Sequence, residues 1–346
     1  MFHLYLNDES SSQTGTVSVF ESLPDKIKAN IFRHLRYQDI FRCHLLCRSI
    51  RQYLLDNITE FDRPDLTELR LEVISCGPIS KQLRLSFRCF SFIDSHACLK
   101  HREFILGREF ARTPLEIPSN LLSLIEEKCK YIIAHGLIIF DSILFNESLC
   151  SCVLKWSSQS SAFCFTNCRV DLPPENFSVL LSNSKCRKLD MDSCCFDQPV
   201  ISDQVLRSMN ECERLHISNC QPSSFDGITS DILNKWETQR RLPKEIYLEG
   251  NATQITAHGI IHLVQEFINR YGQWLNRSGD FADIPQIEWS FGQVKDSSNF
   301  REELSNLAGI LWEVDEKDGH VRVSFESLHQ VIGESVPAVQ FSFFHV

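Results

Sequence analysis

The chain has 346 residues, of which 43% are hydrophobic and 23% charged, and its formal net charge is −10 at pH 7. This length and apolar content suffice for a sizeable core, in one large domain or two unequal ones. The acidic balance and the lack of basic runs with interleaved aromatics argue against a nucleic-acid partner. No apolar run approaches the roughly 18 residues that a membrane-spanning helix needs.

Residues 1–18 are expected to form a disordered lead-in, because Asn7 to Ser18 is rich in Ser, Thr, Gln and Gly. Met1 to Ser22 lacks the basic start and the apolar core of a signal peptide. Without such a signal, an odd count of 15 cysteines argues against a framework of disulfides. We therefore expect a protein of the cytoplasm or the nucleus.

Residues 19–58 are predicted to contain three short helices. Pro24 suits the first turn of a helix, Asp39 can cap a second one, and Leu46 to Leu55 is typical of a third. The first helix carries an apolar stripe at four-residue intervals: Ile27, Ile31 and Leu35. A unit of about 40 residues cannot bury all of its own apolar surface, so it should dock on another protein.

The order Leu-Pro-x2-Ile-x3-Ile-Phe-x2-Leu-x3-Asp-Ile over residues 23–40, followed by Leu-Cys-Arg-x-Ile-Arg over 46–51, resembles the F-box family. The resemblance implies that these helices bind the Skp-type adaptor of a cullin-RING ubiquitin ligase. It also implies the adaptor-binding positions: Leu23, Pro24, Ile27, Ile31, Leu35, Leu46, Cys47 and Ile50. The chain departs from the family pattern at Ile50, where a tryptophan is common, and lacks the proline that often precedes the Asp-Leu pair. An ordinary helical cap on the following domain is the alternative.

The segment from Leu23 to Ile58 is basic within an acidic chain. It contains three acidic residues (Asp25, Asp39, Asp56) and seven basic ones: Lys26, Lys28, Arg33, Arg36, Arg42, Arg48 and Arg51. A basic patch favours an acidic partner, through steering and pairs at the rim of the interface.

Between residues 59 and 131, three segments alternate in hydrophobicity as strands do: Leu66 to Leu71, Leu83 to Phe87, and Leu115 to Ile117. The same region holds four zinc-type ligands: Cys89, His96, Cys98 and His101. Their spacing matches no common zinc finger, and structural zinc sites generally need two well-separated pairs. We therefore expect no metal and no other cofactor.

Between residues 132 and 255 the chain repeats itself with a period of about 26 residues. Pairs of apolar residues mark the repeat: Leu137 and Ile139, Phe163 and Phe165, Leu189 and Met191, Leu215 and Ile217, then, after a longer step, Ile246 and Leu248. A small side chain follows three residues later in the later copies: Cys168, Cys194, Cys220 and Asn251. This pattern resembles the leucine-rich repeat, and residues 186–196 are the most complete copy.

The resemblance implies an α/β fold, with an irregular solenoid over residues 59–346 after the F-box. Each apolar pair is expected on a short strand, and the Cys or Asn at a tight turn bonds the backbone of adjacent coils. The outer helices are expected at four apolar clusters: Phe177 to Leu181, Val205 to Met209, Ile232 to Trp236 and Ile260 to Ile268.

The end of the chain is predicted to cap the array of repeats. Ile287 to Trp289 suggests one more strand, and Ile310 to Phe325 a β-hairpin about Lys317 to Gly319. Phe341 to Phe344 suggests a last strand. A solenoid needs such covers because its open ends would otherwise expose the core.

Residues between and after the paired apolar positions should point away from the core and line the concave face. We predict a substrate-binding surface there: Ile138, Phe140, Asp190, Asp192, His216, Tyr247 and Glu249, with Cys164, Thr166 and Ser218 in the same columns. Such a surface suits a protein carrying apolar and basic groups. A solvated sheet face that binds nothing is the alternative.

The sequence therefore predicts a non-catalytic substrate-recognition subunit of a Skp–cullin–F-box ubiquitin ligase, with a protein substrate of unknown identity. Its contribution would be proximity, because it holds the substrate near the ubiquitin-loaded conjugating enzyme. The layout is similar to that of lineage-expanded F-box families of invertebrates. Two alternatives are a scaffold that ubiquitinates nothing, and a cysteine- or zinc-dependent enzyme built on the solenoid.

Overall fold

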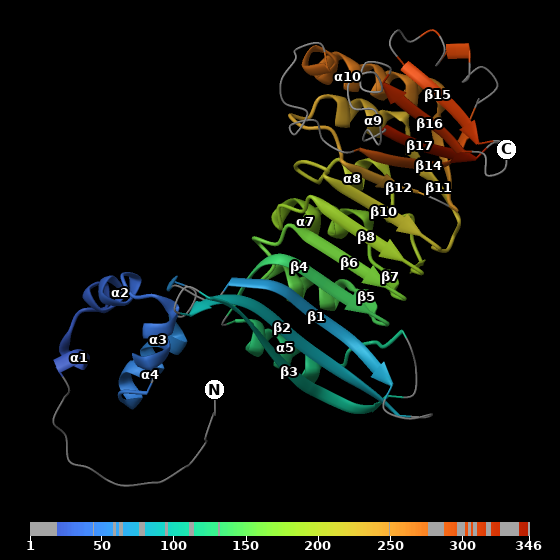
Figure 1. Cartoon of the computed structure of the whole chain (residues 1–346). Helices are drawn as coiled ribbons and strands as arrows, with labels where there is room; N and C mark the ends of the chain where they lie inside the picture. Colours follow the sequence, from blue (N-terminus) through green and yellow to red (C-terminus); the bar gives the residue numbers. More distant parts are fainter. Residues whose placement is uncertain are drawn as a thin grey trace. The chain divides into compact units, whose positions relative to one another are not determined.

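The computed structural model describes residues 19–43, 45–57, 60–61, 65–75, 80–93, 96–110, 114–130, 132–248, 250–275, 287–295, 302–303, 306, 310–315, 320–325 and 339–344. The predicted lead-in at 1–18 and the turn at Lys317 to Gly319 lie outside these residues. The chain is a mixed α/β protein with two compact units, Met1–Pro64 and Asp65–Val346 (Figure 1). We call them the N-terminal unit and the C-terminal unit.

The described part of the N-terminal unit is helical. It contains α1 (Val19–Ser22), α2 (Asp25–Arg33), α3 (Tyr37–Cys43) and α4 (Arg48–Asp56). Helices occur at the three predicted places, and α1 precedes them. Two details were wrong: Asp39 lies within the first turn of α3 and does not cap it, and α2 ends at Arg33, before Leu35. The core is small and aromatic. The ring centroid of buried Phe32 lies 5.6 Å from that of Phe61, 5.7 Å from Phe20 and 5.9 Å from Tyr53.

The C-terminal unit is built on one large sheet with the strand order β15-β16-β17-β14-β12-β10-β8-β6-β4-β1-β2-β3. The strands are β1 (Asp65–Ser75), β2 (Lys81–Ile93), β3 (His96–Phe110), β4 (Ile133–Asp141), β6 (Ala162–Thr166), β8 (Lys188–Asp192), β10 (Arg214–Ser218), β12 (Glu245–Tyr247), β14 (Glu288–Lys295), β15 (Ile310–Asp315), β16 (His320–Phe325) and β17 (Val339–Phe344). All pairs from β1–β4 to β14–β17 are parallel.

Shorter strands and helices complete each repeat. The strands are β5 (Leu144–Asn146), β7 (Arg169–Asp171) and β9 (Cys195–Phe196), which form a second sheet, and β11 (Ser224–Thr229) and β13 (Ala252–Thr256). The helices are α5 (Ser119–Cys129), α6 (Glu147–Leu154), α7 (Pro174–Asn183), α8 (Asp203–Leu206), α9 (Ser230–Glu237) and α10 (Ala257–Leu275). Consecutive helices pack against one another along one side of the large sheet (Figure 1). None of the described helices is long and apolar enough to cross a membrane.

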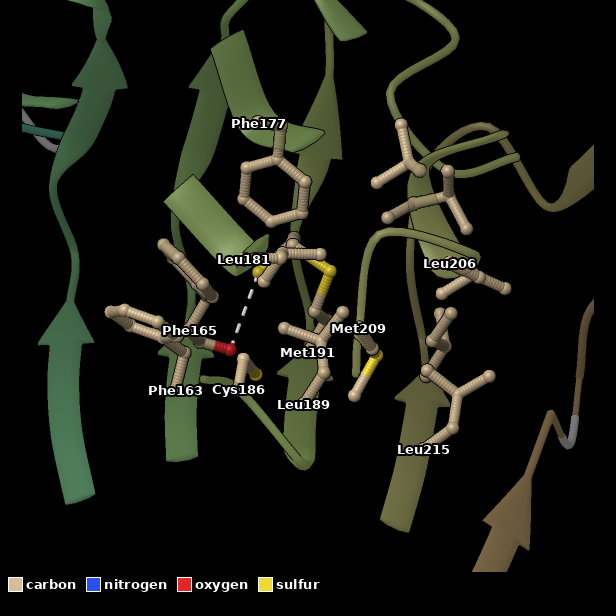
Figure 2. Packing of buried hydrophobic residues seen from close by; sticks show 14 of the residues in the cluster. Phe163, Phe165, Phe177, Leu181, Cys186, Leu189, Met191, Leu206, Met209 and Leu215 are labelled. Carbon is tan, nitrogen blue, oxygen red and sulfur yellow. Dashed lines mark hydrogen bonds between the residues drawn. The ribbon is translucent and has the colours of Figure 1, made fainter. Parts of the chain in front are cut away.

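The predicted repeat matches the pairing of the central strands. Phe163 pairs with Leu189, and Leu189 with Leu215, so equivalent positions of successive repeats lie side by side. These residues are fully buried and face the helices, where Phe177 and Leu181 of α7 are also fully buried (Figure 2). The alternation of a strand therefore puts every second residue into the core and leaves the others on the opposite face.

The small side chains after each strand make the predicted hydrogen bonds. Cys194 Sγ donates to the carbonyl oxygen of Phe165 on the previous strand (3.4 Å), which Figure 2 marks by a dashed line. Cys168 bonds Phe140 in the same way, and Cys220 bonds Met191. Each ladder residue follows a residue with positive φ: Asn167 (52°), Ser193 (55°), Asn219 (53°) and Gly250 (76°). This left-handed residue turns the chain at the end of the strand.

The predicted register of the first copy was wrong by one residue. Ile138 pairs with Phe163 and Phe140 with Phe165, so Ile138 and Phe140 are fully buried core residues. The left-handed residue of this coil is Ser142 (φ 61°), which places the buried Ile143 in the ladder position. Residues 137–140 are all apolar, so either face could have been the core, and a shift of one residue reverses every side chain.

The sheet begins with an antiparallel part that the repeat does not explain. β1 pairs parallel to β4 and antiparallel to β2, and β3 pairs antiparallel to β2 at the edge. The sequence predicted a strand at Leu115 to Ile117. In the structure Leu115 does not belong to a strand of the large sheet and forms an isolated bridge with Ile143. Gly136 permits the close approach of β1, because a Cβ there would lie 2.0 Å from the carbonyl oxygen of Thr67.

The far end of the sheet has three further strands after β14. β15 and β16 pair antiparallel, as expected for the predicted hairpin. β17 does not lie at the edge, because it pairs parallel to β14 and antiparallel to β16.

Candidate functional site

The N-terminal unit exposes large apolar side chains. The exposed fraction is 45% for Ile27, 44% for Ile31, 84% for Leu45 and 69% for Leu46. In the described part of the chain, only Ile105 and Val179 are other large apolar side chains of the exposed class. Uncovered apolar side chains gathered within so small a unit mark a surface for a partner protein.

The division of α2 into two faces explains why Ile27 and Ile31 are exposed. They lie four residues apart and share a face. The other face carries Ala29 and Phe32, which are buried. The aromatic cluster around Phe32 anchors that face, so the isoleucines are left outside the core.

The turn between α3 and α4 holds the other exposed pair. The N–H groups of Leu45 and Leu46 donate to the carbonyl oxygens of Arg42 and Cys43 (3.0 and 3.1 Å). Cys47, which is exposed, is the N-cap residue of α4. These bonds fix the turn in a shape that keeps both leucines out of the core.

The eight predicted adaptor-binding residues fall into two groups. Pro24, Cys47 and the apolar residues Ile27, Ile31 and Leu46 are exposed. Leu35 and Ile50 instead pack in part against the unit's own core, and Leu23 is half-buried. Leu45 was missed by the sequence pattern, although it is the most exposed large apolar residue of the described chain.

The N-terminal unit also carries several basic side chains. Lys28 pairs with Asp25 (3.1 Å), Arg33 with Glu60 (2.7 Å) and Arg42 with Asp39 (3.0 Å). Lys26, Arg36 and Arg51 are exposed. The pairs of Arg33 and Arg42 are exposed, and exposed pairs contribute little to stability. The exposed basic side chains of the unit favour an acidic partner.

The second candidate surface is the face of the large sheet away from the helices, which we call the open face. Its central row crosses adjacent strands in direct register: Arg70, Ile139, Cys164, Asp190, His216, Tyr247 and Ser290. The corrected register puts Ile139 in this row, where Ile138 had been predicted. Ile138 and Phe140 belong to the core and cannot contact a substrate. Glu249 lies outside the described residues.

Two ion-pair networks hold the charged side chains of the open face. On β8 to β12, Arg214 lies 2.9 Å from Asp190 and 3.2 Å from Glu245. Burial raises the pKa of Asp190, and the nearby Arg214 opposes that rise. On β1 to β3, Arg84 lies 2.7 Å from Glu72 and 3.2 Å from Glu103.

Asp192 and the ring pair His216–Tyr247 lie side by side on this face. Ser218 Oγ and Asn219 Nδ2 donate to Asp192 Oδ1 (2.6 and 3.1 Å), and the bond from Ser218 is the main cause of the lowered pKa of Asp192. The rings of His216 and Tyr247 meet edge to face with centroids 4.5 Å apart. This part of the open face therefore combines a carboxylate of fixed orientation, Asp192, with two aromatic rings.

Three buried cysteines of the described chain are unsuited to nucleophilic chemistry. Burial raises the pKa of Cys150 and of Cys186 to about 12 and that of Cys129 well above its usual value. Such thiols are inert at neutral pH. No group of three or more His, Cys, Asp or Glu side chains suited to a metal ion occurs among the residues described. The side chains of His96 and Cys98 lie outside them.

A protein-family model described as F-box-like matches residues 20–59. No curated protein matches the chain. The matched segment contains α2, α3 and α4 and the exposed residues Ile27, Ile31, Leu45 and Leu46. Domains of this kind typically bind Skp-type adaptors as non-catalytic subunits. Residues 20–59 are therefore an F-box-like domain.

Proposed function

We propose that the chain is a substrate-recognition subunit of a Skp–cullin–F-box ubiquitin ligase and performs no bond chemistry itself. The observation that carries the proposal is the exposure of Ile27, Ile31, Leu45 and Leu46 within the F-box-like domain. An adaptor that covered them would remove apolar surface from water, which is the main favourable term in most protein association.

The C-terminal unit is, on this proposal, an irregular leucine-rich-repeat-type solenoid that captures a protein substrate. Three features support this assignment: the parallel strands, the Cys and Asn ladder, and the stacked helices. The open face is the proposed place of the substrate because none of the described helices of this unit lies on it. Asp190, Asp192, His216 and Tyr247 remain proposed contact residues.

Co-purification with a Skp-type adaptor tests the proposal, with Ile31→Asp as the deciding variant. A carboxylate buried at the dock has no partner, so binding should weaken at least about tenfold. Val179→Asp is a matched control, because Val179 is also 44% exposed but lies on α7. Equal adaptor binding by the Ile31→Asp chain would contradict the proposal.

Recovery of a cullin separates a ligase subunit from a scaffold. A ligase subunit should bring down the cullin through the adaptor, and a bound protein should be lost in a proteasome-dependent manner. A scaffold would bind the adaptor and leave its bound protein stable.

A further inference from the structure

A second row on the open face carries negative charge without a basic partner. Asp141, Thr166, Asp192 and Ser218 are register neighbours on β4, β6, β8 and β10, and we call them the acidic row. Among the ion pairs of the described residues, none includes Asp141 or Asp192; the nearby pairs use Asp190, Glu213 and Glu245. With strands about 4.8 Å apart, the two carboxylates stand about 10 Å from each other.

The carboxylate of Asp192 is held in place before any ligand arrives. Three side chains donate hydrogen bonds to it: Ser218 and Asn219 to Oδ1 (2.6 and 3.1 Å) and Ser193 to Oδ2 (3.2 Å). These donors are neutral, so they orient the carboxylate but do not cancel its charge. A fixed, ionised carboxylate is a strong acceptor for a charge-assisted hydrogen bond, because little entropy is lost on binding.

The carboxylates on the neighbouring strands β1 to β3 already have basic partners. On β1 to β3, the carboxylates are matched by guanidinium groups: Glu68 with Arg88 (3.3 Å), Glu72 with Arg84 (2.7 Å) and Glu103 with Arg84 (3.2 Å). The carboxylates on β1 to β3 are thus matched, whereas the acidic row has no ion-pair partner among the described residues.

Aromatic and apolar side chains lie next to the acidic row. His216 and Tyr247 form the edge-to-face pair on β10 and β12, and the face of a tyrosine ring attracts a guanidinium or ammonium group. On the other side, Ile139 and Cys164 are adjacent on β4 and β6. Ile139 is only 7% exposed, so a ligand that fits this arrangement offers positive charge to the row and to the ring of Tyr247.

We propose that the acidic row binds a segment of another protein in the polyproline II conformation that carries two basic side chains three residues apart. In the polyproline II conformation a chain has three residues per turn and rises about 3.1 Å per residue, so side chains three residues apart lie on the same side and about 9 Å apart. That separation is close to the distance between Asp141 and Asp192. The inference rests on the proposed function, because it names the class of substrate that the ligase subunit captures.

Charge also decides against other occupants. The phosphates of a nucleic acid are repelled by the acidic row. A second copy of the chain has a net charge of −10, so the acidic row repels it on balance. Sedimentation of the full chain should therefore show no self-association through the acidic row. Self-association that Asp141→Asn/Asp192→Asn abolishes would overturn the assignment.

Binding of synthetic peptides to the full chain tests the proposal. The probe is a fluorescein-labelled peptide of repeated Arg-Leu-Ser units, read by fluorescence anisotropy, with matched peptides in which Glu or Gln replaces Arg. The unmutated chain should bind the Arg peptide at least tenfold more tightly than either matched peptide, and added salt should weaken that binding. Equal binding of the three peptides would overturn the proposal.

Asp141→Asn/Asp192→Asn should weaken binding of the Arg peptide at least tenfold. Glu127→Gln/Glu175→Gln makes the same change of charge on exposed residues of α5 and α7 and should leave it unchanged. Thr166→Lys places a cation between the two carboxylates and should also abolish binding, which guards against a folding defect of the double variant. Undiminished binding by Thr166→Lys or the Asn variant would overturn the proposal. Adaptor binding, measured on the same samples, should not change, so this failure is distinct from failure of the proposed function.

Discussion

Asn251 Nδ2 donates a hydrogen bond of 2.8 Å to the carbonyl oxygen of Ile217, a residue 34 positions earlier in the chain. The same amide nitrogen lies 3.3 Å from the carbonyl oxygen of Leu248. Asn251 is 1% exposed, so it joins two successive coils from inside the protein. It extends to a fourth coil the bonding that Cys168, Cys194 and Cys220 provide.

Asn251→Ala should lower the free energy of unfolding by about 1–3 kcal/mol, because it removes a buried side-chain donor to the carbonyl oxygen of Ile217. Urea denaturation followed by circular dichroism measures the change. Gln254→Ala is the control, because its amide bonds an exposed carboxylate, that of Asp226. If Asn251→Ala cost no more than about 0.5 kcal/mol, as ordinary surface substitutions do, the ladder would not stabilise the coils.

Buried and exposed thiols should differ sharply in alkylation. Cys194 is 1% exposed and its pKa is raised through its bond with Cys168, whereas its neighbour Cys195 is exposed. Iodoacetamide at pH 8 should therefore modify Cys195 and spare Cys194, Cys186 and Cys150 until the chain is unfolded. Mass spectrometry of tryptic peptides gives the site of labelling. Rapid labelling of Cys186 in the native chain would contradict this burial.

Phe140 tests the register of the first coil. It is fully buried and its ring stacks on that of Phe165 with centroids 5.2 Å apart. Phe140→Ala should cost about 3–5 kcal/mol, as other large-to-small changes in cores do. Asp141→Ala, one residue later on the open face, should change the free energy of unfolding by no more than about 0.5 kcal/mol. The reverse order of the two effects would restore the register predicted from sequence.

Ser218→Ala should raise the pKa of Asp192 toward its ordinary value of 3.8, because the main cause of the lowering is lost. A carboxyl whose pKa is depressed on folding stabilises the fold above its unfolded pKa and loses that effect as the pH falls through the folded pKa. The unmutated and Ser218→Ala chains should thus differ most in stability near neutral pH and least in acid. Titration of Asp192 by NMR and urea denaturation at several pH values measure both effects. A stability difference that grows as the pH falls into the acid range would be the wrong sign.

Phe32→Ala should unfold the helices of the N-terminal unit, because it empties the centre of an aromatic cluster that has few other members. Adaptor binding would then be lost together with helicity. Ile31→Asp should remove adaptor binding and keep the helical signal, since Ile31 is exposed. Limited proteolysis distinguishes the two variants, and equal sensitivity to protease would show that Ile31 also supports the fold.

The parts of the fold that the sequence predicts are those with several independent markers. The later coils carry both an apolar pair and a ladder residue at a fixed offset, so Leu189, Met191 and Cys194 could be assigned without ambiguity. The first coil has Ile143 in the ladder position. Because its neighbours are also apolar, Ile143 does not reveal the register of that strand.

Long-range pairing left no such mark. Nothing near Leu69 or Leu83 indicates that β1 joins β4 or that β2 and β3 continue the sheet as a hairpin. In the N-terminal unit, the motif identified Ile27, Ile31 and Leu46 as surface residues. It missed the aromatic core around Phe32 and the exposed Leu45, because packing across the unit decides both.

The fixed offset between each central strand and its ladder residue determines where the chain can accept insertions. The step from Leu215 to Ile246 is longer than the step from Leu189 to Leu215, yet Asn251 still follows Leu248 by the same offset as Cys220 follows Ile217. The additional residues lie in the stretch that contains β11 and α9. Insertions between the central strands can therefore accumulate without changing the register of those strands. The side chains of the open face can then be substituted one at a time.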